Sequence, residues 1–171
     1  MDNFGFIHEK LDIKILILFI LRRLPGAVDR NLLQDFVQVD SGIGYFDYSD
    51  CLSELVDAGL VIEEEDGYRA SEKGADAGAT VESSLPYSVR KKAEKLIAPE
   101  AERLRRLSML TAEHENGEGG CVVTLAMDDG KGEIIRVKLL CSGDEQAKRI
   151  EKNFKHNAEK IYGDIIEMLD K

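Results

Sequence analysis

The first strong hydrophobic pattern of the chain runs from residue 11 to residue 24. Apolar side chains recur at three- and four-residue steps with others between them, which is the pattern of a helix buried on nearly all sides; the stripe consists of Leu11, Ile15, Leu18 and Phe19. Pro25-Gly26 ends this predicted helix. The run contains three cations and is shorter than the ~20 apolar residues that span a bilayer. We therefore interpret it as a core helix and expect no membrane association.

Two shorter helical patterns follow. Asp29 is the predicted cap of the first, because its carboxylate suits the free N–H groups of a first turn; the core positions of this helix are Leu32, Leu33, Phe36 and Val37. After a turn at residues 41–44, Asp47 is the predicted cap of the next helix, whose core positions are Tyr48, Leu52, Leu55 and Val56. Gly59 fits the left-handed position just beyond a helix end.

A hairpin pattern follows the third helix. Strand patterns at residues 60–62 and 68–70 flank Asp66-Gly67, which is a strong signal for a two-residue turn. Ser71 then caps a predicted fourth helix. Three short helices followed by a hairpin are the element order of a winged helix-turn-helix domain, and we assign this domain to residues 1–80.

Residues 81–113 are predicted to be a linking helical region. Beyond Pro86 an apolar stripe recurs at helical spacing and ends at Leu107. Pro99 interrupts it and predicts a kink or a restart at Ala98-Pro99, because proline lacks the N–H that a helix interior uses. We also expect residues 107–113 to form a first strand of the next region.

Residues 114–171 combine strand and helix patterns. Cys121–Met127 and Ile134–Cys141 are predicted strands of a hairpin, with one shared face formed by Val123, Leu125, Met127, Ile135, Val137 and Leu139. A long final helix follows, with an apolar stripe at Ala147, Ile150, Phe154, Ala158, Ile161, Ile165 and Leu169. The predicted fold class is α+β: an N-terminal winged helix-turn-helix, a linking helix, and a small antiparallel sheet packed by a long helix. The apolar surface of the final helix is wider than one small sheet covers, which predicts a homodimer built on this region.

Charge is distributed unevenly along the chain. The net charge is −10, and residues 1–80 carry nine of these charges, with seven Lys and Arg against sixteen Asp and Glu. This sign is opposite to that of a general DNA-binding surface. Three cysteines without a CxxC pair and no export signal predict a cytoplasmic protein.

Two segments resemble known proteins. The first contains Leu52-x-x-Leu55-Val56-x-x-Gly59-Leu60-Val61 followed by Gly67-Tyr68-x-x-Ser71-x-x-Gly74. It is similar to the recognition helix, wing and following helix of bacterial winged-helix regulators of the MarR and PadR type, which implies operator binding by a dimer. The second contains Glu145-Gln146-Ala147, Asn153-Phe154 and Ile161-Tyr162. Together they resemble a family of small bacterial winged-helix proteins known only as a domain of unknown function, and this resemblance covers nearly the whole chain.

Two functions compete for the acidic N-terminal domain. The first is a DNA-binding transcriptional regulator that acts as a homodimer, with DNA-contact candidates Ser49, Ser53, Arg30, Arg69 and Lys73, and further cations at Arg22 and Arg23. The alternative is an acidic protein-interaction module that does not bind DNA, because the outward positions of the third helix include Asp50, Glu54 and Asp57. The resemblance favours the regulator, and the charge favours the interaction module.

The remaining reactive side chains predict no chemistry. His8, His114 and His156 lack the spacing of a metal site, and we expect no metal, cofactor or catalytic residue, so the chain is predicted not to be an enzyme. Cys121 and Cys141 can lie opposite each other across the hairpin, either as two buried free thiols, which we favour, or as a redox pair. The basic clusters 90–95 and 103–106 are interpreted as the wet face of an amphipathic helix, with nucleic acid or an acidic protein surface as alternative contacts.

Overall fold

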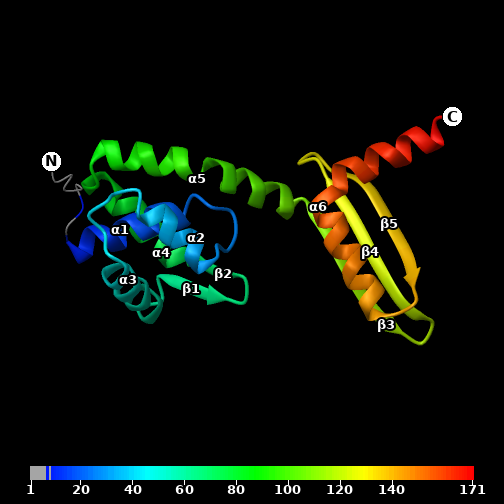
Figure 1. Ribbon diagram of the computed structural model, residues 1–171, viewed down its shortest axis with the longest axis horizontal. Helices are drawn as coiled ribbons and strands as arrows, with labels where there is room; N and C mark the ends of the chain where they lie inside the picture. Colours follow the sequence, from blue (N-terminus) through cyan, green and yellow to red (C-terminus); the bar gives the residue numbers. More distant parts are fainter. Residues whose placement is uncertain (1–6, 8) are drawn as a thin grey trace. The chain divides into compact units, whose positions relative to one another are not determined.

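The computed structural model describes residue 7 and residues 9–171. Its contacts divide the chain into two compact units, Met1–Leu104 and Arg105–Lys171, and each unit is described by itself (Figure 1). The elements confirm the predicted α+β class, with helices and a hairpin followed by a long helix, a three-stranded sheet and a final helix. Among the described residues, no helix has the length and apolar character that a membrane crossing requires.

Helix α1 (Lys10–Leu21) is the centre of the first unit. From Ile13 to Leu21 every residue except Lys14 is buried, as predicted from the nearly continuous apolar run. Helices α2, α3 and α4 all contact α1. The prediction for Leu11 is wrong, because its side chain is 63% exposed. Leu11 lies in the first turn of α1, and the helix is enclosed only from Ile13 onward.

Helices α2 (Arg30–Val37) and α3 (Tyr45–Asp57) follow. The Asp29 cap is confirmed, since its carboxylate accepts hydrogen bonds from the backbone N–H groups of Asn31 at 2.8 Å and Leu32 at 3.3 Å. The predicted Asp47 cap is wrong, because α3 begins three residues earlier than expected, with Gly44 at its cap position. Asp47 lies instead in the first turn, where its negative charge interacts favourably with the positive end of the helix dipole. The side chains that α3 buries are Tyr48, Cys51, Leu52 and Leu55.

Strands β1 (Val61–Glu64) and β2 (Gly67–Ala70) form the predicted hairpin, but its two-residue turn is Glu65-Asp66, one residue earlier than expected. Gly67 therefore belongs to β2, at φ +133°. A Cβ there would lie 2.1 Å from the Val28 carbonyl oxygen, and Val28 and Tyr68 exchange backbone hydrogen bonds of 2.9 and 2.8 Å. This close pairing joins the hairpin to the segment before α2. The three helices and the hairpin are consistent with a winged helix.

Two further helices complete the first unit. Ser71 caps α4 (Glu72–Val81) as predicted, because its hydroxyl oxygen accepts a hydrogen bond from the Gly74 N–H at 3.0 Å. A 3-10 turn, η1 (Glu82–Ser84), leads to α5 (Tyr87–Ser108). The predicted restart at Ala98-Pro99 does not occur, since α5 continues through Pro99 as one helix. The loss of one N–H donor is therefore tolerated within the helix.

The second unit is a three-stranded antiparallel sheet of β3 (Leu110–Gly117), β4 (Gly120–Asp128) and β5 (Glu133–Cys141), with β4 in the centre. The predicted shared face of the β4–β5 hairpin is confirmed by the register Val123↔Leu139, Leu125↔Val137 and Met127↔Ile135. The first strand begins at Leu110, three residues later than expected.

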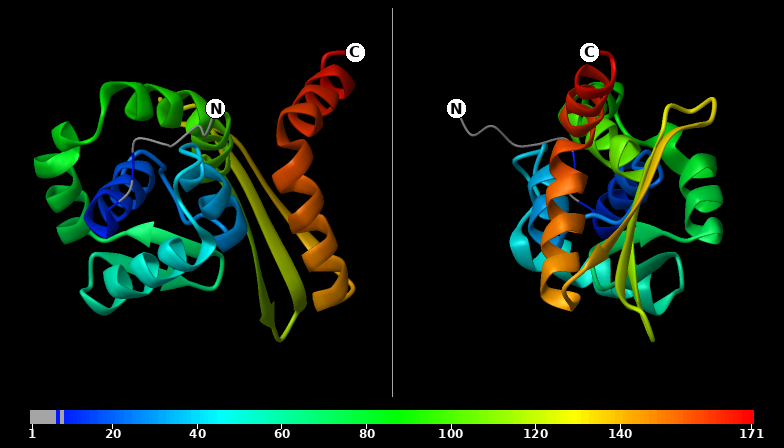
Figure 2. Two further views of the ribbon diagram at one scale, coloured as in Figure 1. Left: turned by 60° about the vertical axis from the view of Figure 1, so that its left-hand side comes forward. Right: turned by 90° about the vertical axis from the view of Figure 1, so that its right-hand side faces the viewer.

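Helix α6 (Asp144–Leu169) covers one face of this sheet (Figure 2). Ala147, Phe154 and Ala158 are buried against β4 side chains, as the apolar stripe predicts. The helix is interrupted at Asn157, whose backbone is non-helical at φ −129°. The residues after this break are largely exposed, including Ile166, Met168 and Leu169.

Candidate nucleic-acid interface

Helix α3 presents an outward face with one aromatic residue and no cation. Its buried residues lie on one side, and a rotation of 100° per residue places Phe46, Asp50, Ser53 and Asp57 on the opposite side. All four are exposed, and Phe46 is 81% exposed. Its ring forms an edge-to-face pair with Tyr45, with 5.6 Å between the centroids. The outward face is therefore apolar at its first turn and acidic further on.

Arg30 and Ser49, two of the predicted contact residues, are brought together by the structure. The Arg30 guanidinium at the start of α2 donates a hydrogen bond of 2.8 Å to the Ser49 Oγ on α3. The Tyr48 hydroxyl donates to the Arg30 carbonyl oxygen at 3.1 Å, and burial raises the pKa of this phenol. The pair is thus anchored by a neutral, buried tyrosine. Ser53 lies one turn further along α3.

Two cations that the sequence analysis did not select lie beside α3. Lys10 contacts the Asp50 carboxylate at 3.2 Å, and Lys14 contacts the Glu54 carboxylate at 2.5 Å. The hydrogen bond from Lys14 lowers the pKa of Glu54, and the hydrogen bond to Asp50 raises the pKa of Lys10. The charges of Asp50 and Glu54 are therefore partly neutralised by lysines of α1. The only sequence signal for these ion pairs was a common spacing. Lys10 and Lys14 are four positions apart, as are Asp50 and Glu54, which places each two on one face of a helix.

The hairpin carries another predicted contact residue, Arg69. Arg69 on β2 forms an ion pair with Glu64 on β1, and the Tyr68 hydroxyl donates to the Glu63 carboxylate at 2.7 Å. Glu65 and Asp66 at the tip are exposed. Lys73 is exposed in the first turn of α4. The predicted contact residues thus form two groups, one on α2 and α3 and one on the hairpin and α4.

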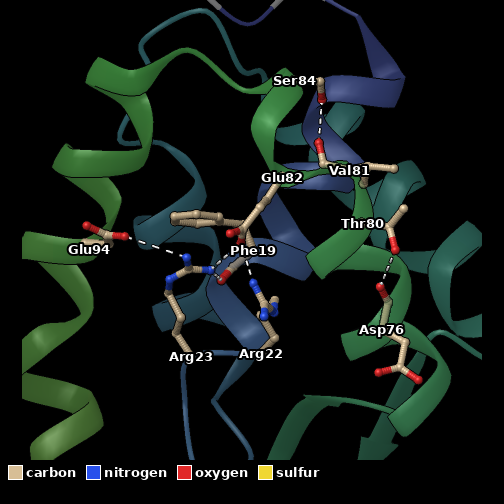
Figure 3. A network of polar contacts seen from close by, with 9 residues as sticks. All are labelled: Phe19, Arg22, Arg23, Asp76, Thr80, Val81, Glu82, Ser84 and Glu94. Atoms are coloured by element: carbon tan, nitrogen blue, oxygen red, sulfur yellow. Dashed lines mark hydrogen bonds and ion pairs between the residues drawn. The ribbon is translucent and has the colours of Figure 1, made fainter.

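Arg22 and Arg23 hold the first unit together. Arg22 pairs with the Glu82 carboxylate, and Arg23 contacts Glu82 at 3.0 Å and Glu94 at 3.6 Å (Figure 3). The Arg23 guanidinium also lies over the Phe19 ring, 3.6 Å from its centroid. Burial raises the pKa of Glu82, but the two arginines outweigh it and the pKa is lowered. The expectation that these arginines are available to DNA is therefore wrong, because they connect α1 to η1 and α5.

The charged face of α5 contains acids as well as cations. Lys91 pairs with Glu94 at 3.3 Å, and Arg103 pairs with Glu100 at 2.6 Å. Each pair joins an exposed cation to a partly buried glutamate three positions away on the helix. This pattern fits the interpretation of a solvated amphipathic face.

The second unit contains a charged cluster between sheet and helix. The two ring nitrogens of His114 on β3 lie 2.6 Å from carboxylate oxygens of Glu151 and Asp144 on α6. Within residue 7 and residues 9–171, no set of three His, Cys, Asp or Glu side chains is arranged to hold a metal ion. His8 lies outside the described residues. The cluster is an electrostatic link between β3 and α6.

Comparison with known proteins gives one match. A family model described as a domain of unknown function (DUF4364) matches residues 13–169. Neither a curated protein nor a solved structure gives a significant match to the chain.

Proposed function

The chain belongs to the family described as a domain of unknown function (DUF4364), and we propose from the geometry that its first unit is a winged helix that binds DNA. The chain would act as a homodimeric transcriptional regulator without enzymatic activity. The observation that carries the proposal is the position of α3, which follows α2 and precedes the hairpin, with Arg30 and Ser49 joined beside its first turns.

Residues of α3 and of the start of α2 supply suitable contacts. In helix-turn-helix proteins the N-terminal residues of the second helix contact base edges while neighbouring groups hold phosphates. Ser49 and Ser53 have hydroxyls that bond to several bases, and Arg30 carries a positive charge at the start of α2. These three side chains are assigned to the DNA surface.

Lys10 and Lys14 reduce the electrostatic objection to DNA binding. They hold Asp50 and Glu54 in ion pairs on the α1 side of α3. Two cations therefore lie next to α3 and offset part of its negative charge, which lowers the repulsion from a phosphate backbone. The acids of the hairpin tip remain, and they limit how closely the wing approaches the backbone.

The protein-interaction module is a second candidate, and Phe46 favours it. An 81% exposed phenylalanine beside Tyr45 is the kind of aromatic anchor that protein interfaces bury. Exposed acids follow it on α3 and at the hairpin tip. A basic protein surface would fit this arrangement better than a phosphate backbone does.

A salt titration of binding to mixed-sequence DNA fragments separates the two functions. The DNA-binding proposal expects measurable affinity at low salt, and Arg30→Ala should reduce the slope of log affinity against log salt by about one unit. Lys91→Ala is the matched control, since it removes an exposed cation from α5 and should leave the slope unchanged. Undetectable wild-type binding at low salt would overturn the proposal and favour the interaction module.

A further inference from the structure

Two cysteines face each other on neighbouring strands of the second unit. Cys121 on β4 is the direct register partner of Cys141 on β5, and both thiols are free. The two residues are 3% and 6% exposed, on the face that α6 covers. Directly opposed residues of antiparallel strands have Cα atoms about 4.5–5.5 Å apart. Disulfides span about 4.4–6.8 Å between Cα atoms, so this register brings the pair within bonding geometry.

Both cysteines lie at the same end of the sheet, Cys121 near the start of β4 and Cys141 at the end of β5. Cys121 follows Gly120, which with Gly117 closes the β3–β4 hairpin, and Cys141 is the last residue of β5. Strand ends open locally at a lower free energy than strand centres. Burial raises the pKa of the Cys121 thiol, and a local opening of the strand ends admits a small reagent to the pair.

Cys51 provides a natural contrast within the same chain. It lies in the middle of α3, is fully buried, and its thiol contacts the Lys10 carbonyl oxygen at 3.5 Å. It belongs to the first unit, whereas the facing pair belongs to the second. Cys51 is therefore a buried thiol in a helix, with no cysteine in register with it.

We propose that Cys121 and Cys141 are an oxidation site at which a peroxide forms an intramolecular disulfide. One thiol loses its proton and its sulfur attacks a peroxide oxygen, the O–O bond breaks, and the leaving hydroxide takes up that proton, so that a sulfenic acid and water result. The second thiol attacks the sulfenic sulfur, the S–O bond breaks, and the S–S bond and a second water form. Two thiols and one hydrogen peroxide thus give one disulfide and two waters.

The disulfide would tie the centre of the sheet to its β5 edge where α6 begins. Ser142 and Gly143 separate Cys141 from α6, and the Ser142 N–H donates to the Gln146 side-chain oxygen at 2.7 Å. The bond closes a loop that contains the whole β4–β5 hairpin, which restricts the unfolded chain. The oxidised protein should therefore have a higher unfolding midpoint than the reduced protein.

The test treats the full chain with hydrogen peroxide under non-denaturing conditions and measures intact mass and peptide maps. The expected product is a monomeric chain that has lost the mass of two hydrogen atoms, with a Cys121–Cys141 cross-linked peptide. Cys51→Ser should react like the wild type, and Cys141→Ala should lose the product. The wild-type peptide map decides the matter even where a variant fails to fold. A disulfide through Cys51, a cross-link between chains, or overoxidation without an internal bond would each overturn the proposal.

Discussion

Gly74 determines how closely α4 approaches the start of β1. A Cβ at this position would lie 1.8 Å from the Leu60 carbonyl oxygen, which is far inside contact distance. The Ser71 hydroxyl donates to the Gly59 carbonyl oxygen at 2.8 Å, so the N-terminal turn of α4 is held against this segment. The hairpin and the helix after it are thus packed through backbone rather than side chains.

Gly74→Ala should destabilise the first unit by about 1–3 kcal/mol, because the added methyl group forces backbone atoms apart. Gly163→Ala is the matched control, since Gly163 is an exposed helix residue with nothing within 4 Å of an added Cβ. The control should stabilise α6 by about 0.5–1 kcal/mol, because alanine is the better helix former. Denaturant unfolding followed by circular dichroism measures both changes. Equal effects of the two variants would show that the approach of α4 is not this close.

At the level of elements, His114 connects β3 to α6. A ring that donates to both Glu151 and Asp144 must carry two protons. The hydrogen bonds to Glu151 and Asp144 raise the pKa of His114 above its ordinary value of 6.5. Asp144 is also held by Lys148 at 2.6 Å, and its pKa is lowered by that hydrogen bond and by His114. The link is therefore a charged one that depends on pH.

The stability of the second unit should fall as the pH rises above neutrality. Because the pKa of His114 is raised in the folded state, its contribution to the free energy of unfolding is complete below the unfolded pKa of about 6.5. That contribution is lost as the pH rises through the higher folded pKa. His114→Gln should remove this fall in stability above the unfolded pKa of about 6.5. His156→Gln is the control, because the His156 ring contacts the Lys152 carbonyl oxygen within α6. Parallel pH profiles for wild type and His114→Gln in denaturant unfolding would contradict the assignment.

At the scale of the whole molecule, the last turns of α6 leave apolar side chains uncovered. After the break at Asn157, Ile166 and Leu169 are 47% and 78% exposed, although they belong to the apolar side of the helix. Apolar surface of this kind on a small unit usually marks an interface. A second copy of the chain is the partner that the proposed homodimeric regulator requires.

Sedimentation equilibrium at micromolar concentration should give twice the chain mass of 19.1 kDa. Ile166→Glu should shift the protein to the monomer, because a charge within the interface would lack a partner. Phe46→Glu places the same charge at an exposed apolar residue of the first unit and should leave the dimer intact. A wild-type chain that sediments as a monomer would contradict the homodimer.

The sequence by itself determined the elements and much of their core, because these depend on local periodicity and caps. Asp29 and Ser71 cap the helices they were expected to cap. The β4–β5 register followed from alternating apolar residues joined by a short loop, since a shift by one residue would turn the apolar face to water. The turn at Glu65-Asp66 differed by one residue, because Gly67 is required for the close contact with Val28 rather than for the turn.

Only the tertiary structure decided which charges of the candidate site are available. Lys10 and Asp50 are forty positions apart in the chain, and Arg22 and Glu82 are sixty apart. Sequence patterns report the character of each helix face but not which faces meet, so Arg22 and Arg23 were expected to face DNA and the lysines beside α3 were missed. Ion pairs form where packing brings helices together, and that packing depends on the whole core around α1.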